Sequence, residues 1–327
     1  MNQTADSIFS KKASLSFRGI AILMVMLSHY AEWWSWFYTL EGGAETFRHF
    51  LAGLGPYGVA VFLLFSGYGL TKSAGDNRIG LPFILKRFFS VYIPYLIVDF
   101  IRNLLSNSLQ TGADWLDMLI GDDFWYMTIL FLFYIAFMVI WFAFKNKHLR
   151  AGFLLAATLI INYFLITTDK QDFWFISNYA FLIGVLLALY EKICKRVIDI
   201  LGVYLAIAFG IASIFAMRND ILIDHTMELP EVQIKIQIYM VLIFLCFIIF
   251  IAAKWRWYDV VTVFLGKHTL YLYLIHTFIF MWAVNFFTFK ISLRFLVAFV
   301  ITLFVSVILQ FLFSFIIKKC IKPSKRG

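Results

Sequence analysis

Residues 16–29 read Ser-Phe-Arg-Gly-Ile-Ala-Ile-Leu-Met-Val-Met-Leu-Ser-His, and they begin an apolar run that extends to about residue 38. A run of this length can cross the hydrocarbon core of a bilayer as one helix. Two ionisable side chains, Arg18 and His29, interrupt it. Such side chains are costly inside a membrane helix, and those that occur usually face the bundle interior and serve a function. The stretch therefore predicts a transmembrane helix that carries a functional site.

The composition of the whole chain indicates an integral membrane protein. The 327 residues are 62% hydrophobic and 14% charged, whereas soluble domains are nearer half apolar and a quarter charged. The alternating pattern of a transmembrane β-barrel is absent, and a helix satisfies its own backbone in lipid. We expect an all-α protein with ten transmembrane helices, at about residues 16–38, 50–71, 83–105, 124–144, 149–168, 173–190, 197–217, 233–253, 260–284 and 292–317.

Lysine and arginine set the expected orientation of these helices. With the N-terminus in the cytoplasm, most of the 28 lysines and arginines fall in cytoplasmic segments, and the outer loops are rich in acidic residues. Both termini are therefore predicted to be cytoplasmic, as a polar tail (residues 1–15) and a basic tail (residues 318–327). The same distribution accounts for the net charge of +9 without a nucleic-acid partner. We expect one membrane domain over residues 1–327, in an inner or plasma membrane.

Two histidines are expected well inside the spans. His29 follows Arg18 by eleven residues, and His276 follows Lys267 by nine, so they lie about 16 Å and about 13 Å deeper at 1.5 Å per residue. They would form one site if the first and ninth helices pack together, and histidine suits proton transfer near neutral pH. For each, the alternative is a buried histidine bonded to a backbone carbonyl. The remaining histidines are expected to be solvated: His49, His148, His225 and His268.

Three further polar side chains are candidates for a substrate passage. Glu32 shares a helix face with His29 and would orient its imidazole; the interpretation we favour is an exposed glutamate at the membrane interface. Ser66 and Tyr68 of the second apolar stretch would line a passage for a polar ligand. The glycines around them instead indicate close helix packing, and both interpretations remain open.

A basic pair, Lys86 and Arg87, precedes the third apolar stretch. These side chains suit phosphate groups, and anchoring at the cytoplasmic face explains them equally well. The three cysteines show neither a CxxC motif nor metal-ligand spacing, so we expect no disulfide framework, no metal site and no bound cofactor.

Taken in order, these motifs resemble the acyltransferase family 3 membrane proteins, the O-acyltransferases of bacterial surface polysaccharides. The similarity covers nearly the whole chain, and any one of its motifs alone is weakly specific. One departure is Ser90, which stands where the family usually has a second arginine of an Arg-x-x-Arg motif. The matching elements are Arg18 and His29 in the first helix, Gly58–Phe62 and Ser66–Tyr68 in the second, Arg87 and Pro94 at the third, Phe124–Tyr126, Phe181–Gly184, and Leu265–His276.

The resemblance implies an acyl transfer across the membrane. An acyl-CoA, expected to be acetyl-CoA, would enter from the cytoplasm, with its phosphates near Lys86, Arg87 and Arg18. His29 would act as general base on a hydroxyl of a lipid-linked or exported glycan. Ser66, Tyr68, Glu32 and three residues of later helices would shape the passage: Trp125, Tyr126 and His276. A polytopic transporter or exporter of a small molecule or glycan precursor is the alternative function.

Overall fold

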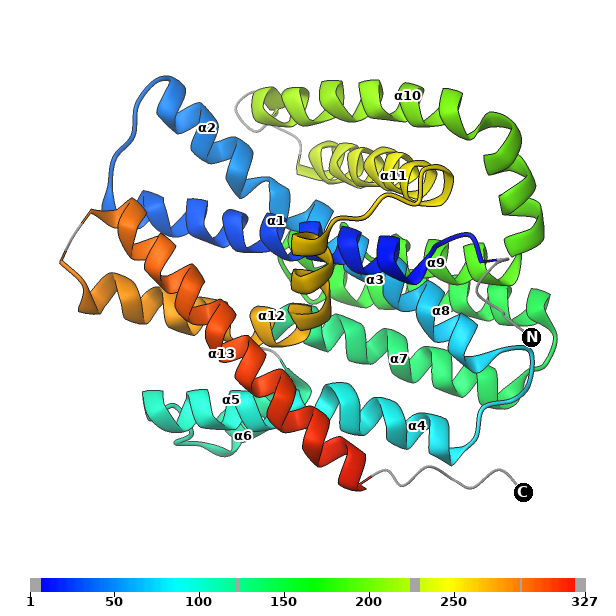
Figure 1. Ribbon diagram of the computed structural model, residues 1–327, viewed down its shortest axis with the longest axis horizontal. Coiled ribbons are helices and arrows are strands. Elements are labelled where there is room, and N and C mark those ends of the chain that lie inside the picture. Colours follow the sequence, from blue (N-terminus) through cyan, green and yellow to red (C-terminus); the bar gives the residue numbers. More distant parts are fainter. Residues whose placement is uncertain (1–6, 122–123, 224–229, 289, 321–327) are drawn as a thin grey trace. The chain divides into compact units, whose positions relative to one another are not determined.

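The computed structural model describes residues 7–121, 124–223, 230–288 and 290–320, and these form helices joined by short connections (Figure 1). The helices are α1 (Lys11–Phe37), α2 (Gly43–Ala52), α3 (Leu54–Ala74), α4 (Leu81–Arg87), the π-helix η1 (Phe88–Tyr92), α5 (Ile93–Ser106), α6 (Gly112–Ile120), α7 (Trp125–Ala143), α8 (Lys147–Thr167), the 3-10 helix η3 (Asp172–Trp174), α9 (Tyr179–Leu189), α10 (Glu191–Ile223), α11 (Pro230–Lys254), α12 (Val260–Phe286) and α13 (Ile291–Cys320).

The prediction of ten transmembrane helices is confirmed, because ten helical segments among the described residues are long and apolar enough to cross a membrane. The largest differences lie at the first, second and seventh spans, and the seventh begins at Glu191 rather than near residue 197. The first begins at Lys11 rather than near residue 16, because the Ser10 hydroxyl accepts a hydrogen bond from the amide of Ala13 and caps the helix. The second begins at Gly43, because α2 leads into α3 with one residue between them.

The chain divides into two compact units, which we describe separately. The first unit comprises Met1–Arg78 and Leu132–Lys267, and the second comprises Ile79–Phe131 and His268–Gly327. Helix α12 passes from the first unit to the second between Lys267 and His268. Whether the two units act as one functional domain, as the sequence suggests, stays a prediction.

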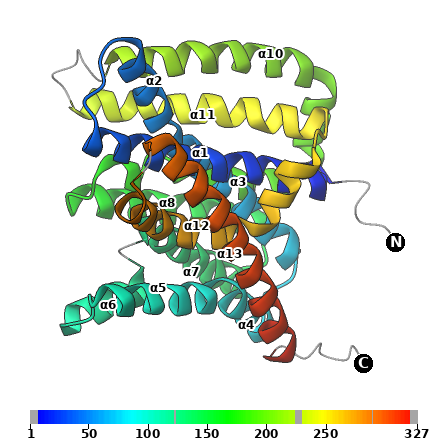
Figure 2. The same ribbon diagram turned by 60° about the vertical axis from the view of Figure 1, so that its left-hand side comes forward.

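In the first unit, α3 lies against α1 and α9, and α10 lies along α11 in both views (Figure 2). Glycines allow the closest of these approaches. Gly67 of α3 faces the backbone of Phe181 in α9, and Gly184 of α9 faces the backbone of Leu64 in α3. A side chain at either glycine would therefore collide with main-chain atoms. Small residues at contacts between membrane helices commonly allow the backbones to approach this closely.

Helix α1 is held closely on two sides. A Cβ at Gly58 of α3 would lie 2.7 Å from the carbonyl oxygen of Ala21. Gly19 of α1 faces the backbone of Thr262 near the start of α12, and Gly266 of α12 faces the backbone of α1. The first and ninth spans are α1 and α12, and they thus pack together at the beginning of α12.

In the second unit, α4, η1 and α5 follow one another without a break, and α6 packs beside α5. The Tyr95 hydroxyl of α5 donates a hydrogen bond to the carbonyl of Met118 in α6. The Tyr92 hydroxyl donates to the carbonyl of Leu119, 2.9 Å away. Gly121 follows α6 with φ of 89°, a conformation that glycine adopts without strain. Helix α6 is therefore fixed at its C-terminal end to the middle of the third span.

Candidate functional site

His29 lies in the second half of α1, half-buried. Its ring stacks on Trp33 one turn later, with 6.1 Å between ring centroids and an interplanar angle of 17°. The residue before it is tied to the neighbouring helix, because the Ser28 hydroxyl donates to the carbonyl of Ala52. The backbone beside His29 is thus anchored to α2, and its ring lies against that of Trp33.

Arg18 is half-buried in the first half of α1, and its Nε donates to the carbonyl of Ser14 at 3.3 Å. The next residue, Gly19, is the point of close contact with α12. Because α1 is one continuous helix, Arg18 and His29 are separated by about 16 Å along its axis, as the sequence predicted. The structure therefore places the cation and the imidazole at different depths of one helix.

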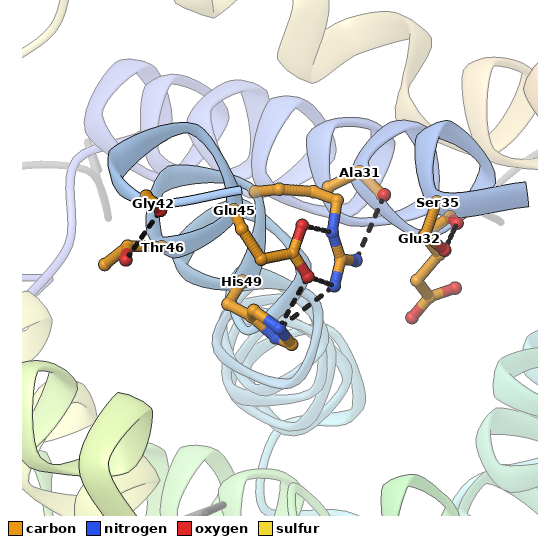
Figure 3. A network of polar contacts seen from close by, with 8 residues as sticks. Ala31, Glu32, Ser35, Gly42, Glu45, Thr46 and His49 are labelled. Atoms are coloured by element: carbon orange, nitrogen blue, oxygen red, sulfur yellow. Dashed lines mark hydrogen bonds and ion pairs between the residues drawn. The ribbon is translucent and has the colours of Figure 1, made fainter. Parts of the chain in front are cut away.

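Beyond His29, the end of α1 carries a charged network with α2 (Figure 3). Arg48 donates to both carboxylate oxygens of Glu45, at 2.9 and 2.6 Å, and to the carbonyl of Ala31 at 3.4 Å. His49 lies 2.9 Å from the same carboxylate. Glu32, at the adjacent position of α1, has an exposed side chain, and the Arg48 charge acts on it. Its role in orienting His29 stays a prediction.

Tyr68 lies at the opposite end of the first unit's helices from this network. Its buried ring packs on Phe9, and its hydroxyl contacts Ser7 at 2.7 Å and donates to the carboxylate of Glu191. Glu191 also pairs with Lys72 at 2.6 Å and accepts from the amide of Ile8 at 2.9 Å. Tyr68 therefore joins the chain before α1 to α3 and α10. Ser66, half-buried in α3, precedes Tyr68 by two residues in the same helix.

In the second unit, Lys86 is exposed and Arg87 is half-buried, with its guanidinium 5.6 Å from the ring centre of Phe83. The π-helix η1 follows at once. Ser90, which replaces the expected second arginine, lies inside it and donates its hydroxyl to the carbonyl of Arg87 at 3.4 Å. A π turn holds more residues than an α turn and often marks a functional position. The position at which the resemblance led us to expect a second arginine thus lies in a local change of helical geometry.

Trp125, Tyr126 and His276 meet in one aromatic cluster of the second unit. Tyr273 packs edge-on against Tyr126, with centroids 5.2 Å apart, and its ring lies 5.8 Å from that of His276. Trp125 contacts Tyr126 at 6.4 Å. His276 is fully buried, and its Nδ1 lies 2.7 Å from the carbonyl of Tyr273. It therefore has the carbonyl-bonded geometry that the sequence left open, in which Nδ1 carries the proton and Nε2 faces away from that carbonyl.

One sequence expectation is wrong. His268 was expected to be solvated at a helix end, but α12 begins eight residues earlier and His268 is only 7% exposed. His148 is exposed, with Nδ1 2.8 Å from the Tyr190 hydroxyl, and His225 lies outside the described residues. Among the residues that the structure describes, no three side chains of His, Cys, Asp or Glu are grouped so that they could hold a metal ion.

The model of the acyltransferase domain of the acyltransferase 3 family matches residues 16–311. The chain belongs to the acyltransferase 3 family. No curated protein and no solved structure matches it.

Because it belongs to this family of membrane acyltransferases and has ten helical segments of spanning length among its described residues, this acyltransferase 3 protein is a multi-pass membrane protein. The match begins at Ser16, two residues before Arg18, and extends past His276 into α13. Every site residue named from the sequence therefore falls within the family's domain. The charged tails on either side of it lie outside.

The structure also shows buried polar contacts that were not among the candidate residues predicted from the sequence. Asp99 of α5 is fully buried and accepts hydrogen bonds from Tyr95 at 3.0 Å and Asn103 at 3.2 Å, and it pairs with Arg102 at 2.9 Å. A charged residue within the third apolar stretch was a visible signal for this group, because such residues are rare in spans. Glu191 gave no comparable signal, since it lies at the end of a span among other charges.

Proposed function

We propose that the protein transfers a short acyl group, expected to be acetyl, from cytoplasmic acyl-CoA to a hydroxyl of a lipid-linked or exported surface glycan. The observation that carries the proposal is the imidazole of His29, half-buried in a spanning helix of a chain that belongs to an acyltransferase family. Histidine is the side chain best suited to accept a proton from a hydroxyl near neutral pH. Its location in α1, the helix at which the family match begins, fits that role.

In a direct transfer, His29 takes the proton of the acceptor hydroxyl as its oxygen attacks the thioester carbonyl. The new C–O bond forms, the C–S bond breaks, and the thiolate of coenzyme A leaves. The imidazolium then returns the proton to the thiolate, so charge and protons balance. General-base catalysis of this kind contributes about 10²- to 10⁴-fold in rate, and the stacking of His29 on Trp33 limits the entropy lost when the ring is aligned.

The cationic side chains suit the donor. Coenzyme A carries several phosphates, which arginine binds through paired N–H groups and lysine binds as a point charge. Lys86 is exposed, and Arg87 presents its guanidinium beside Phe83 at the start of η1. Arg18 is in the cytoplasmic half of α1 if the N-terminus is cytoplasmic. We propose that these three residues hold the donor while its thioester extends toward His29.

Mass spectrometry of the surface glycan tests this function. Cells that carry the gene should have glycan units heavier by one acyl ester than cells that lack it, and a gene copy with His29→Ala should not restore the mass. Membrane vesicles with labelled acetyl-CoA supply the donor side of the test. Substrate flux through reconstituted protein without acyl-CoA, together with an unchanged glycan mass, would support a transporter and refute the proposal.

A further inference from the structure

The second unit contains a polar cavity of about 470 Å³ that none of the catalytic candidates line. It is bounded by the C-terminal end of α5, the following turn, α6 and the second half of α12. Its volume lies within the range of small-molecule sites. Side chains that face it include Arg102, Asn103, Asp114, Asp117, Thr277 and Phe278.

The charges of the cavity wall indicate the class of ligand. Asp114 and Asp117 bring two carboxylates, and the one guanidinium, Arg102, is already paired with the buried carboxylate of Asp99 at 2.9 Å. The wall therefore has no net positive charge, which disfavours the phosphates of coenzyme A. Carboxylate, amide and hydroxyl groups are instead partners for hydroxyl groups. Phe278, 39% exposed, adds an apolar surface. This combination suits an uncharged sugar ring.

The polar groups around the cavity are held in place before any ligand arrives. Asp99 fixes Arg102 and Asn103 from the protein side, at 2.9 and 3.2 Å. Asp114 closes the capping box of α6, where it accepts hydrogen bonds from the amide and the hydroxyl of Thr111 at 2.6 and 2.9 Å. Side chains that are already ordered lose less entropy when a ligand binds. The wall is thus a preorganised surface.

The cavity lies at the opposite end of the third span from the basic pair. Arg102 follows Lys86 by sixteen residues of continuous helix, which is about 24 Å, most of the thickness of a bilayer core. If Lys86 and Arg87 meet acyl-CoA at the cytoplasmic face, the cavity is close to the outer face. An exported or lipid-linked acceptor would arrive there.

The geometry points to this cavity as the binding site for an uncharged sugar residue of the acceptor glycan. The inference rests on the proposed acyl transfer and adds to it the place and chemical class of the acceptor. Asp117 of α6 accepts hydrogen bonds from the sugar hydroxyls, and the Thr277 hydroxyl of α12 exchanges hydrogen bonds with them. Phe278 covers an apolar face of the ring.

Acyl transfer by the full-length protein in vesicles tests the assignment. Labelled acetyl-CoA is the donor, and the envelope fraction of cells lacking the gene, titrated as acceptor, is the probe. Asp117→Asn and Thr277→Val each remove one polar contact with little change of shape, and we expect the acceptor KM to rise about tenfold and about fivefold. The acetyl-CoA KM should stay within about twofold of wild type, because the donor binds elsewhere. Asp169→Asn, an exposed aspartate in the 168–171 turn, is the matched control and should change neither value.

An acceptor KM within twofold of wild type for both variants would overturn the inference, and so would a rise confined to the acetyl-CoA KM. Absence of any transfer by the wild-type protein is a different result, since it refutes the proposed function itself. Sidedness is tested independently in a background without the native cysteines. A membrane-impermeant maleimide should label Ser108→Cys at the cavity in intact cells, and Asp76→Cys only after permeabilisation; the reverse pattern would contradict an outer cavity.

Discussion

Replacing Gly67 with alanine should loosen the contact between α3 and α9. A Cβ at this position would meet the carbonyl oxygen of Phe181 at less than van der Waals distance, and it would lie 3.2 Å from the Phe181 carbonyl carbon and from Cγ2 of Val185. Two of these three atoms belong to the main chain and cannot rotate away. The two helices must therefore separate.

Gly69 supplies a matched control in the same helix, because a Cβ there would have no neighbour within 4 Å. Both substitutions gain about 1 kcal/mol of helix propensity, and this gain cancels when the two variants are compared. The difference then reports the collision alone, for which overpacking costs of about 1–3 kcal/mol are typical. Gly67→Ala should be less stable than Gly69→Ala by that amount, roughly 5- to 150-fold in the unfolding equilibrium constant.

Unfolding of the purified protein in mixed micelles of increasing SDS content, followed by circular dichroism, measures this difference. We expect Gly69→Ala to unfold at or above the wild-type midpoint and Gly67→Ala clearly below it. Equal midpoints for the two variants would refute the close packing of α3 on α9.

Three further perturbations test separate parts of the structure. Arg150→Met should cost about 2 kcal/mol in the same unfolding assay, because the buried guanidinium donates to the carbonyls of Asp76, Asn77 and Phe144, which would lose their partner; an unchanged midpoint would contradict it. Asp99→Ala should cost about 3 kcal/mol, since it leaves Arg102 without its buried counter-charge. Hydrogen bonds from Thr111 and Gln110 lower the pKa of the Asp114 carboxyl below its ordinary value of 3.8. The stabilisation of α6 by this carboxylate should therefore persist above pH 3.8 and be lost as the pH falls through the lowered pKa. Hydrogen exchange of the amides in the first turn of α6 should then become faster. In the Asp114→Asn variant, the exchange rate of these amides should not depend on this titration.

Much of the fold follows from the sequence because lipid restricts the choices. Apolar runs of spanning length must be helices, and the ten predicted runs correspond to the ten observed segments. Glycines also carried packing information, since Gly58 and Gly67 lie at the helix contacts that their positions suggested. The boundaries differ where polar residues cap or extend helices, as Ser10 does for α1.

The candidate site was only partly predictable. His29 and Arg18 are visible in the sequence because charge stands out in an apolar run, whereas the partners of Tyr68 are not. Glu191 lies 123 residues later in the chain, and a hydrogen bond over that separation depends on tertiary packing. The π-helix at Phe88–Tyr92 was equally hidden, because its residues are apolar and compatible with an ordinary helix turn. The local sequence pattern identifies ionisable residues that are costly to place in a membrane helix, whereas their contacts with distant residues depend on the tertiary fold.

The most direct test of the account is acyl transfer by the purified His29→Ala protein, compared with wild type in vesicles loaded with acetyl-CoA and acceptor glycan. The variant should insert and unfold like wild type, because the half-buried ring is not part of the packed core, yet its transfer rate should fall by at least about 10²-fold through loss of the general base. A His29→Ala protein that still transfers acyl groups at the wild-type rate would contradict the central claim.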